Sequence, residues 1–268
     1  MTDVSVLVAG AGGRMGRAII TEAMGNTDVV LVGGVEHAGA LTIGKDLGAL
    51  VGLPDAGMTV GSGLAAGLTS AQAVIDFTLP DASLAIAHAA AAAGVAHVIG
   101  TTGFSDAQLA ELETIASSIP IVKSGNMSLG VNLLLALVEQ AARAMEKDFD
   151  IEIMETHHGA KLDAPSGTAL MLGEAAAAGR GVELGEKAVG IDGNRVGERR
   201  AGDIGFSVVR GGGVIGDHAV QFLGDSEVIT LSHHAIDRSL FAKGALAAAK
   251  WVAGRRPGLY SMQDVLGL

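Results

Sequence analysis

The sequence predicts an α/β protein in which a Rossmann-like dinucleotide-binding domain is followed by an α+β domain with an open mixed sheet. Short apolar runs alternate with helical patterns through the first domain, and a glycine-rich turn follows the first run. Later strand-like segments are separated by Gly and Asp turns, which favours a sheet of another kind. We expect residues 1–127, completed by a returning helix in 238–268, to form the first domain and residues 128–237 the second.

The first domain opens with a strand, a turn, a helix and a second strand. Val4 to Ala9 is a continuous apolar run suited to a strand buried on both faces of a parallel sheet, and Val29 to Val35 is another. Between them, a helical pattern ends near Met24. The unit therefore has the order of a dinucleotide-binding βαβ motif.

The turn after the first strand is rich in glycine. Gly10, Gly13 and Gly16 follow a G-x-x-G-x-x-G spacing, and Met15 stands where the strict G-x-G-x-x-G motif has its third glycine. A plain βα turn is the competing interpretation, but the strand before it and the helix after it favour a pyrophosphate site. The residues expected to bind the cofactor here are Gly10, Ala11, Gly12, Gly13, Arg14 and Met15.

Glu36 ends the second strand and indicates which dinucleotide is bound. Its carboxylate is placed to accept hydrogen bonds from adenosine ribose hydroxyls and would repel a 2′-phosphate. His37 follows it, and Arg14 is a candidate phosphate partner. We therefore expect NADH to be preferred, with NADPH as a second cofactor.

Further strands and helices alternate along the rest of the first domain. Residues 38–70 have weak periodicity, which predicts a short helix and loops. Helices are expected from Pro80 to a stop at Gly94 and after a Ser105 cap, with His88 on the surface. The remaining strands are expected at Ala73 to Phe77, Val95 to Ile99 and Ile119 to Val122.

Composition excludes several classes of function. A net charge of -11 argues against nucleic acid or an anionic membrane surface as partner. The chain has no Cys, so thiolate metal sites and cysteine nucleophiles are excluded. The N-terminus lacks the basic start of a signal peptide, and no apolar run is long enough to span a bilayer. We expect a cytoplasmic protein.

The stretch from Glu152 to Ala169, EIMETHHGAKLDAPSGTA, is the centre of the second domain. It begins as an alternating strand and ends at a helix start, where Ser166 is a candidate cap and Pro165 disfavours helix before it. Amides in the first turn of that helix attract a carboxylate. His157, His158 and Lys161 stand beside it in the sequence. This pattern predicts a pocket for an anionic substrate that receives a proton.

Other elements of the second domain follow the same kind of signals. Ser128 is expected to cap a helix from Leu129 to Met145, and residues 179–203 are expected to form an exposed loop. Asp237 is expected to cap a last helix that ends at Val252, before a tail. The expected strands are Asp150 to Thr156, Ile204 to Arg210, His218 to Leu223 and Glu227 to Ser232.

The central stretch, with the GTTGF and GNMSLGVN segments, resembles the dihydrodipicolinate reductase family, now described as 4-hydroxy-tetrahydrodipicolinate reductases of diaminopimelate and lysine biosynthesis. The resemblance implies reduction of a small cyclic dicarboxylate and a homotetramer built through the open sheets. Family members often carry an arginine where this chain has His37, and bulkier basic residues at Gly159-Ala160. Further cofactor contacts are implied at Gly100, Thr101, Thr102, Gly125, Asn126, Met127 and Ser128.

The chemistry implied needs a proton donor and groups that hold negative charge. We assign proton donation to His157, with Lys161 stabilising charge, holding a carboxylate or donating the proton itself. His158, Lys161 and the amides of Gly167 and Thr168 are expected to bind the substrate, and Asp163 to orient the loop. We expect no metal site, because adjacent His157 and His158 on an extended segment point to opposite faces. His233 and His234 are expected to be structural.

Two other functions compete with this interpretation. One is a different two-domain NAD(P)-dependent oxidoreductase, such as a sugar dehydrogenase; an aspartate-semialdehyde type is excluded because it needs a thiol nucleophile. The other is a non-catalytic dinucleotide sensor, which would bind the cofactor without turnover. Neither accounts for the histidines, the lysine and the DAPSGT helix start together.

Overall fold

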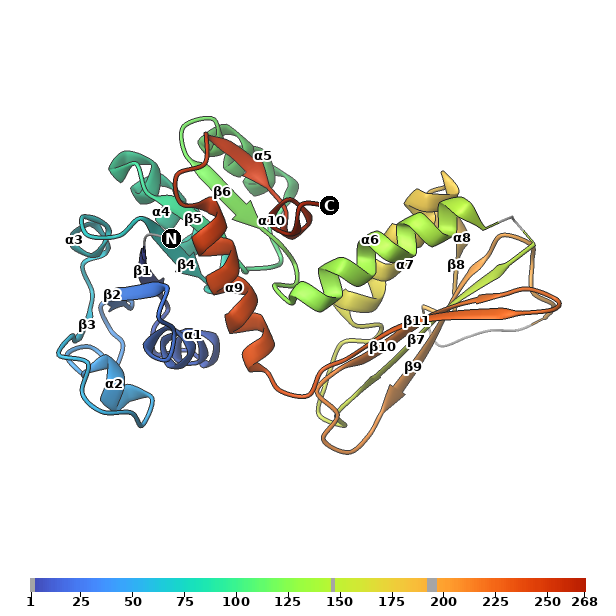
Figure 1. Ribbon diagram of the computed structural model, residues 1–268, viewed down its shortest axis with the longest axis horizontal. Coiled ribbons are helices and arrows are strands. Elements are labelled where there is room, and N and C mark those ends of the chain that lie inside the picture. Colours follow the sequence, from blue (N-terminus) through green and yellow to red (C-terminus); the bar gives the residue numbers. More distant parts are fainter. Residues whose placement is uncertain (1–2, 146–147, 192–196) are drawn as a thin grey trace. The chain divides into compact units, whose positions relative to one another are not determined.

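The computed structural model describes residues 3–145, 148–191 and 197–268 (Figure 1). The chain divides into two compact units. Unit 1 comprises Met1–Leu129 and Ser239–Gly267, and unit 2 comprises Gly130–Arg238 with Leu268. Unit 1 holds a parallel sheet and unit 2 a mixed sheet, so the fold class expected from the sequence is confirmed.

In the described part of the chain, unit 1 is built on a seven-stranded sheet in the order β12-β6-β5-β4-β1-β2-β3, with every pairing parallel. The strand order reverses between β1 and β4, and in such sheets ligands bind at the carboxyl ends beside the reversal. The strands are β1 (Val4–Ala9), β2 (Val29–Val35), β3 (Val60–Gly61), β4 (Ala73–Asp76), β5 (Ala96–Ile99), β6 (Pro120–Lys123) and β12 (Gly258–Tyr260).

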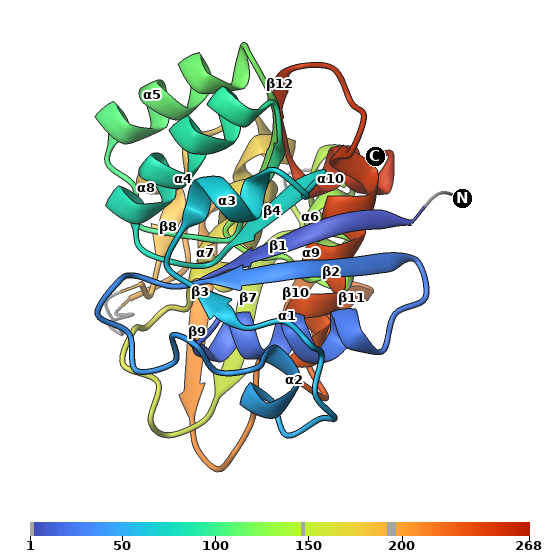
Figure 2. The same ribbon diagram turned by 90° about the vertical axis from the view of Figure 1, so that its left-hand side faces the viewer.

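Helices cover both faces of this sheet, as Figure 2 shows for α3, α4 and α5 on one side and α1 and α9 on the other. Successive residues of β1 point to opposite faces. Val6 and Val8 therefore pack with α1 and α9, while Leu7 and Ala9 pack with α4 and α5. The helices are α1 (Arg14–Met24), α2 (Leu47–Leu50), α3 (Leu64–Leu68), α4 (Pro80–Ala93), α5 (Asp106–Ala116), α9 (Ser239–Val252) and α10 (Met262–Leu266).

The helix ends of unit 1 follow their capping residues. Ser105 forms a capping box with Gln108 at the start of α5. Pro80 occupies the first turn of α4, and Gly94 ends that helix with a φ of 69°. His88 is exposed on α4 and lies 2.6 Å from Glu111. These local predictions are confirmed because each depends on a few adjacent residues.

The last residues of the chain are more structured than the tail expected from the sequence. β12 pairs with β6 at the edge of the sheet, and Ser261 caps α10. The prediction of a tail is wrong here. A three-residue strand has no room for a hydrophobic period, and only its parallel pairing with Pro120–Val122 identifies it.

Unit 2 contains a mixed sheet, which in the described residues has the order β11-β10-β7-β9-β8. β7 runs antiparallel to β10 and parallel to β9. Helices α6 (Leu129–Ala144) and α7 (Gly167–Arg180) pack on one face through a core that includes Ile153, Phe206 and Phe222. The strands are β7 (Asp150–His157), β8 (Ala188–Val189), β9 (Ile204–Arg210), β10 (Asp217–Leu223) and β11 (Val228–His234).

The segment between α7 and β9 differs from the exposed loop expected over residues 179–203. α7 continues to Arg180, and a short helix α8 (Leu184–Lys187) precedes β8, which pairs with β9. That part of the prediction is wrong, because one helical turn and a two-residue strand are too short to show a period. Residues 192–196 of the expected loop lie outside the described residues.

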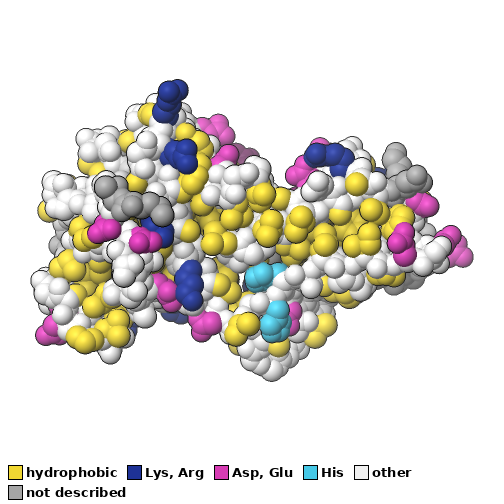
Figure 3. Space-filling model, viewed as in Figure 1, with side chains coloured by type: hydrophobic (Ala, Val, Ile, Leu, Met, Phe, Trp, Pro, Cys, Tyr) yellow, Lys and Arg dark blue, Asp and Glu magenta, His cyan; other side chains and the backbone are white. Residues whose placement is uncertain are grey.

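Helix α6 keeps apolar side chains on its outer side as well as in the core. Leu133 is 43% exposed and Leu137 is 41% exposed, one helical turn apart. Figure 3 shows apolar side chains gathered over this helix. Among the described helices, none combines the length and apolarity needed to cross a lipid bilayer.

Candidate active site

The buried face of strand β7 carries apolar side chains in its first half and ionisable side chains in its second half. Ile151 and Ile153 face the helices, and the same alternation places Glu155 and His157 on that face further along. Glu155 is only 2% exposed and His157 8%. Burying a carboxylate and an imidazole is costly unless they are hydrogen-bonded, so their partners define the site.

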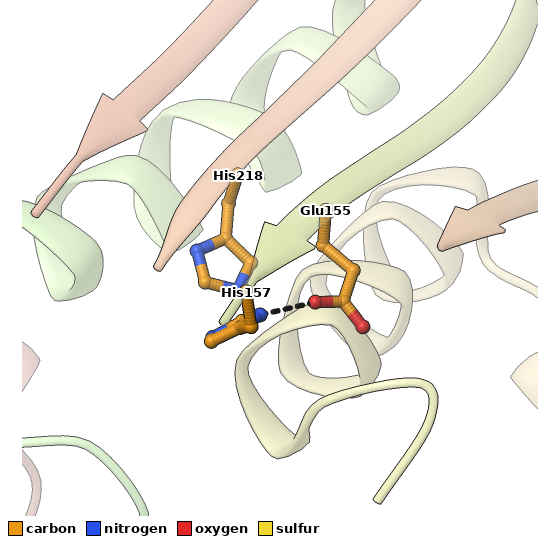
Figure 4. A group of neighbouring side chains, drawn as sticks. All are labelled: Glu155, His157 and His218. Carbon is orange, nitrogen blue, oxygen red and sulfur yellow. Dashed lines mark hydrogen bonds and ion pairs between the residues drawn. The ribbon is translucent and has the colours of Figure 1, made fainter. Parts of the chain in front are cut away.

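The two side chains bond to each other. Nδ1 of His157 contacts the Glu155 carboxylate (Figure 4). A carboxylate only accepts, so the hydrogen lies on Nδ1 and leaves Nε2 for other partners. Burial lowers the pKa of His157 and Glu155 raises it, while Lys161 and Arg210 lower it; the net shift is downward. His157 therefore titrates below its ordinary range.

The end of β7 leads through a turn to the start of α7. Ser166 caps that helix, because its hydroxyl oxygen accepts from the Ala169 amide at 3.2 Å. Gly167 is the first helical residue, and Thr168 follows it. Amides of a first turn have no acceptor within the helix, and the helix dipole makes this end positive. The helix start and the Ser166 cap expected from the sequence are thus confirmed.

The connecting turn carries the other predicted substrate residues. The amide of His158 donates to the Val214 carbonyl at 2.7 Å, which ties the turn to the segment before β10. Lys161 is ion-paired with Asp163 at 2.8 Å. The Asp163 carboxylate therefore holds Lys161 in the turn. Gly159 and Ala160 lie between His158 and Lys161, and both are exposed.

His218 from β10 lies beside His157 and completes a buried cluster. The two rings are 5.1 Å apart in an edge-on arrangement, and Nε2 of His218 lies 3.1 Å from the Ser166 hydroxyl. Burial lowers the pKa of His218 to about 4, with the neighbouring His157 adding to the shift. His218 is therefore a neutral imidazole at neutral pH.

Glu155, His157 and His218 each offer a ligand atom within 4.8 Å of the others, which is a spacing that a metal ion could use. The carboxylate is already engaged, however. Arg210 from β9 donates to both of its oxygens, at 2.8 Å and 3.0 Å. A guanidinium therefore stands as the cation beside this carboxylate, and a metal would have to displace it.

The glycine turn of unit 1 lies between β1 and α1. Gly10 has a φ of 70°, and its carbonyl accepts from the Gly13 amide at 3.0 Å. A Cβ at Gly16 would lie 2.1 Å from the Gly10 carbonyl oxygen, so the close approach of α1 to the turn requires glycine there. Among the described residues, no side chain caps the start of α1 at Gly13, so its first amides can face an anion.

The Glu36 side chain is hydrogen-bonded to the same glycine turn. Its carboxylate accepts from the Gly12 amide at 2.9 Å and from the His37 amide at 3.2 Å. A hollow of about 620 Å³ next to it is large enough for a nucleoside. Arg14 is exposed at the start of α1. The hollow is lined by residues of four strand ends and their loops, including Gly10, Val35, Glu36, Ser62, Phe77 and Thr78.

The loops after β4 and β5 are joined by hydrogen bonds. The Thr78 amide donates to the buried Asp76 carboxylate at 2.9 Å and lies 3.0 Å from the Thr101 hydroxyl. A Cβ at Gly100 would lie 2.2 Å from the Phe77 ring, so glycine is required there. Asp76 therefore fixes the loops that carry Gly100, Thr101 and Thr102.

The segment after β6 is held in the same way. The Ser124 hydroxyl donates to the Asn126 carbonyl at 2.7 Å, and the Asn126 side chain accepts from the Ser128 amide at 2.8 Å. Met127 is only 1% exposed as a whole residue and belongs to the core of unit 1.

Three polar residues of unit 2 were missed by sequence analysis. Glu155 was noted only as part of the central stretch, Arg210 as the end of a strand, and His218 as the start of one. Each comes from a different strand, and the pairing Glu155↔His218 and Glu155↔Val208 brings them together. The available signal was charge on alternate, core-facing positions of otherwise apolar strands.

Comparison with known proteins identifies the family. The family model described as "Dihydrodipicolinate reductase, N-terminus" matches residues 4–127, and "Dihydrodipicolinate reductase, C-terminus" matches residues 130–266. A 4-hydroxy-tetrahydrodipicolinate reductase from Caulobacter vibrioides is 56% identical, covering 98% of this chain and 97% of its own. One from Bradyrhizobium diazoefficiens is 53% identical, covering 100% of this chain and 99% of its own.

Solved structures agree with this result. A dipicolinate-bound dihydrodipicolinate reductase from Paenisporosarcina sp. TG-14 has a TM-score of 0.79 and 25% identity, covering 98% of this chain and 99% of its own. An amine dehydrogenase from Mycobacterium smegmatis, with a TM-score of 0.62 and 14% identity, covering 97% of this chain and 95% of its own, shares the fold alone. The chain, matched over both halves and nearly its full length, belongs to the dihydrodipicolinate reductase family.

Proposed function

We propose that the protein reduces 4-hydroxy-tetrahydrodipicolinate to tetrahydrodipicolinate with NADH or NADPH, a step of diaminopimelate and lysine biosynthesis. Relatives named for this reduction match the chain at 53% and 56% identity. One observation carries the proposal for this chain: the loop that contains Lys161 connects His157, at the end of β7, with the first turn of α7. That arrangement suits an anionic substrate that receives a proton.

The reaction adds a hydride and a proton to the substrate and releases water. A nicotinamide dinucleotide, when bound, supplies the hydride. The residues of unit 2 then have two tasks, which are to hold the two carboxylates and to deliver the proton. The sheet and helix ends of unit 1 hold the dinucleotide through Glu36 and the glycine turn.

His157 is the proposed proton donor. Its Nδ1 is engaged by Glu155, so Nε2 is the nitrogen left to face the substrate. Burial lowers the pKa of His157 while Glu155 raises it, and a general acid works best with a pKa near the operating pH. Lys161 adds a positive charge that stabilises negative charge developing on the substrate.

The carboxylates are assigned to the start of α7 and to the turn before it. The amides of Gly167 and Thr168 lie in the first helical turn, where a carboxylate is stabilised by N–H donors and by the helix dipole. His158 and Lys161 supply further donors. A dicarboxylate is thereby held with one end on backbone amides and the other on side chains.

NADH is the proposed preferred cofactor. The Glu36 carboxylate at the end of β2 favours ribose hydroxyls and repels a 2′-phosphate. His37 takes the position next to it, and Arg14 is exposed two residues after Gly12, whose amide donates to Glu36. NADPH binding then depends on these two residues to offset the repulsion.

We further propose that the protein is a homotetramer assembled through the open face of the unit 2 sheet. Among the described residues of unit 2, both helices that pack on this sheet lie on its other face. The open face carries Val209 and Val228, which are 55% and 54% exposed. Apolar sheet faces of this kind are commonly covered by another subunit.

The reduction is tested by following NADH at its near-ultraviolet absorbance band with the product of the preceding synthase made in situ. NADH should be consumed only when that product is formed. A His157→Gln variant, which keeps a polar side chain of similar length, should bind NADH normally and turn over slowly. If the unaltered protein consumes neither NADH nor NADPH, the proposed reduction is wrong.

A further inference from the structure

We infer that Glu155 is a positioning residue that orients the proton donor His157 and the anion-binding start of α7 as one unit, with Arg210 holding its carboxylate in place. The inference rests on the proposed function, because orientation matters to catalysis only if His157 donates the proton. The side chains involved are Glu155 of β7, which contacts both His157 and the start of α7, and Arg210 of β9, which contacts Glu155.

The Glu155 carboxylate accepts hydrogen bonds from three separate elements. Oε2 contacts Nδ1 of His157 on the same strand, and Oε1 accepts from the Ser166 amide at 2.9 Å. Arg210 donates to Oε1 at 2.8 Å and to Oε2 at 3.0 Å. Each oxygen thus has two donors, and a carboxylate has room for about four. The position of the Glu155 carboxylate is therefore fixed by donors from three elements.

Arg210 extends the same network into the turn. The nitrogen that bonds Oε1 also donates to the carbonyl of Asp163 at 2.8 Å. Asp163 in turn holds Lys161. The donor, the charged lysine and the helix start are consequently all connected to one carboxylate–guanidinium pair. A displacement of Glu155 would shift each of them relative to the others.

The charged groups around His157 include the Glu155–Arg210 pair, so a change in this pair should change the pKa of His157. Facing its ring are Glu155 on β7, Arg210 on β9, His218 on β10 and Lys161 in the turn. Glu155 is the anion among them, and it raises the pKa of His157 against burial and against both cations. Burial raises the pKa of Glu155, but bonds from Arg210, the Ser166 amide and His157 outweigh it, so the carboxylate stays ionised.

A purely structural ion pair is the competing explanation. Buried pairs of that kind are often replaceable by apolar residues without loss of stability. Such a pair would need neither contact with a titrating ring nor a bond to a helix start. The contact between Nδ1 of His157 and Oε2 distinguishes the two explanations, because it makes the proton affinity of His157 depend on the charge of Glu155.

The test is the variant Glu155→Gln, which keeps the shape and removes the charge. Without the carboxylate, the pKa of His157 should fall, so its protonated form is lost at lower pH. We expect kcat to fall about 100-fold at neutral pH, and the decline of kcat with rising pH to begin at lower pH. NADH binding, which uses unit 1, should be unchanged.

Glu139→Gln is the matched control. Glu139 lies on α6 of unit 2 and is also paired with an arginine, Arg143. Its pH profile should equal that of the unaltered protein. If Glu155→Gln loses activity uniformly at every pH, or loses none, the positioning role is wrong. Turnover by the unaltered protein in the same assay shows that the proposed function itself stands.

A second measurement does not depend on the folding of Glu155→Gln. In the unaltered protein, ¹⁵N-histidine NMR reports which ring nitrogen of His157 carries the hydrogen, with His157→Gln identifying the signal. We expect hydrogen on Nδ1 in the neutral ring. A neutral ring with its hydrogen on Nε2 would overturn the inference, because Glu155 could then not be its acceptor.

Discussion

The Ser166 hydroxyl lies 3.1 Å from Nε2 of His218, so the residue that caps α7 is bonded to a buried imidazole from β10. Because the pKa of His218 is lowered by burial to about 4, this imidazole is neutral at physiological pH. The cap, and with it the start of α7, is therefore connected to a group that titrates in mild acid.

His218 should make the protein less stable in mild acid. Its folded-state pKa of about 4 lies below the ordinary 6.5, so between these values the unfolded chain binds more protons. Unfolding free energy should therefore fall as pH drops from 6.5 to 4, by up to roughly 3 kcal/mol from this residue. Urea denaturation at several pH values, compared with His218→Gln, measures it. An equal slope in both proteins would contradict the assignment.

Lys161→Ala should reduce turnover on the order of 100-fold or more, because a positive charge beside the developing substrate charge is removed. NADH binding should change little, since Lys161 belongs to unit 2 and the glycine turn to unit 1. Steady-state kinetics and fluorescence titration with NADH separate the two. Lys187→Ala in α8 is the control. Equal loss of turnover and of NADH binding would mean that Lys161 is structural.

Glu36→Ala should weaken NADH binding more than NADPH binding. In the proposed complex with NADH, the Glu36 carboxylate accepts charged hydrogen bonds from ribose hydroxyls, worth about 10- to 100-fold in affinity. For NADPH, the variant also removes the repulsion between the Glu36 carboxylate and the 2′-phosphate, and this gain offsets the lost hydrogen bonds. Calorimetric titration with both nucleotides checks this, with Glu22→Ala in α1 as control. If both affinities fall equally, Glu36 does not contact the ribose.

Pyridine-2,6-dicarboxylate should compete with the substrate and not with NADH. A relative of known structure is described as dipicolinate-bound, and the start of α7 offers amides for one carboxylate. Ser166→Ala removes the cap and should weaken inhibition several-fold, since a lost cap costs about 1 kcal/mol. Inhibition kinetics at varied substrate test both points. No inhibition at all would argue against a dicarboxylate pocket.

Gly16→Ala should destabilise unit 1 and weaken NADH binding together. The added Cβ would lie 2.1 Å from the Gly10 carbonyl oxygen, so α1 or the turn must move, at a cost of about 1–3 kcal/mol. Gly185→Ala, where a Cβ meets nothing within 4 Å, is the matched control. Thermal unfolding and NADH titration measure the effect. Unchanged binding would show that the turn tolerates displacement.

The sequence was sufficient for elements whose signal is local. Apolar runs such as Val4 to Ala9 could be assigned because a strand buried on both faces has no polar positions. Helix boundaries at Ser105, Gly94 and Ser166 followed from capping chemistry within a few residues. The short elements β8, α8 and β12 were not predicted, because each is too short to show a period and is identified by pairing or packing.

By itself, the sequence determined that a glycine turn follows β1 and that α7 starts at Ser166, a few residues after His157 and Lys161, because glycine spacing, capping and charge are properties of neighbouring residues. Only the tertiary structure decided which groups surround His157. Arg210 and His218 are more than 50 residues away along the chain, and strand pairing alone places them at Glu155. Long-range contacts of this kind leave no periodic signal in the sequence, since each strand shows only its own alternation.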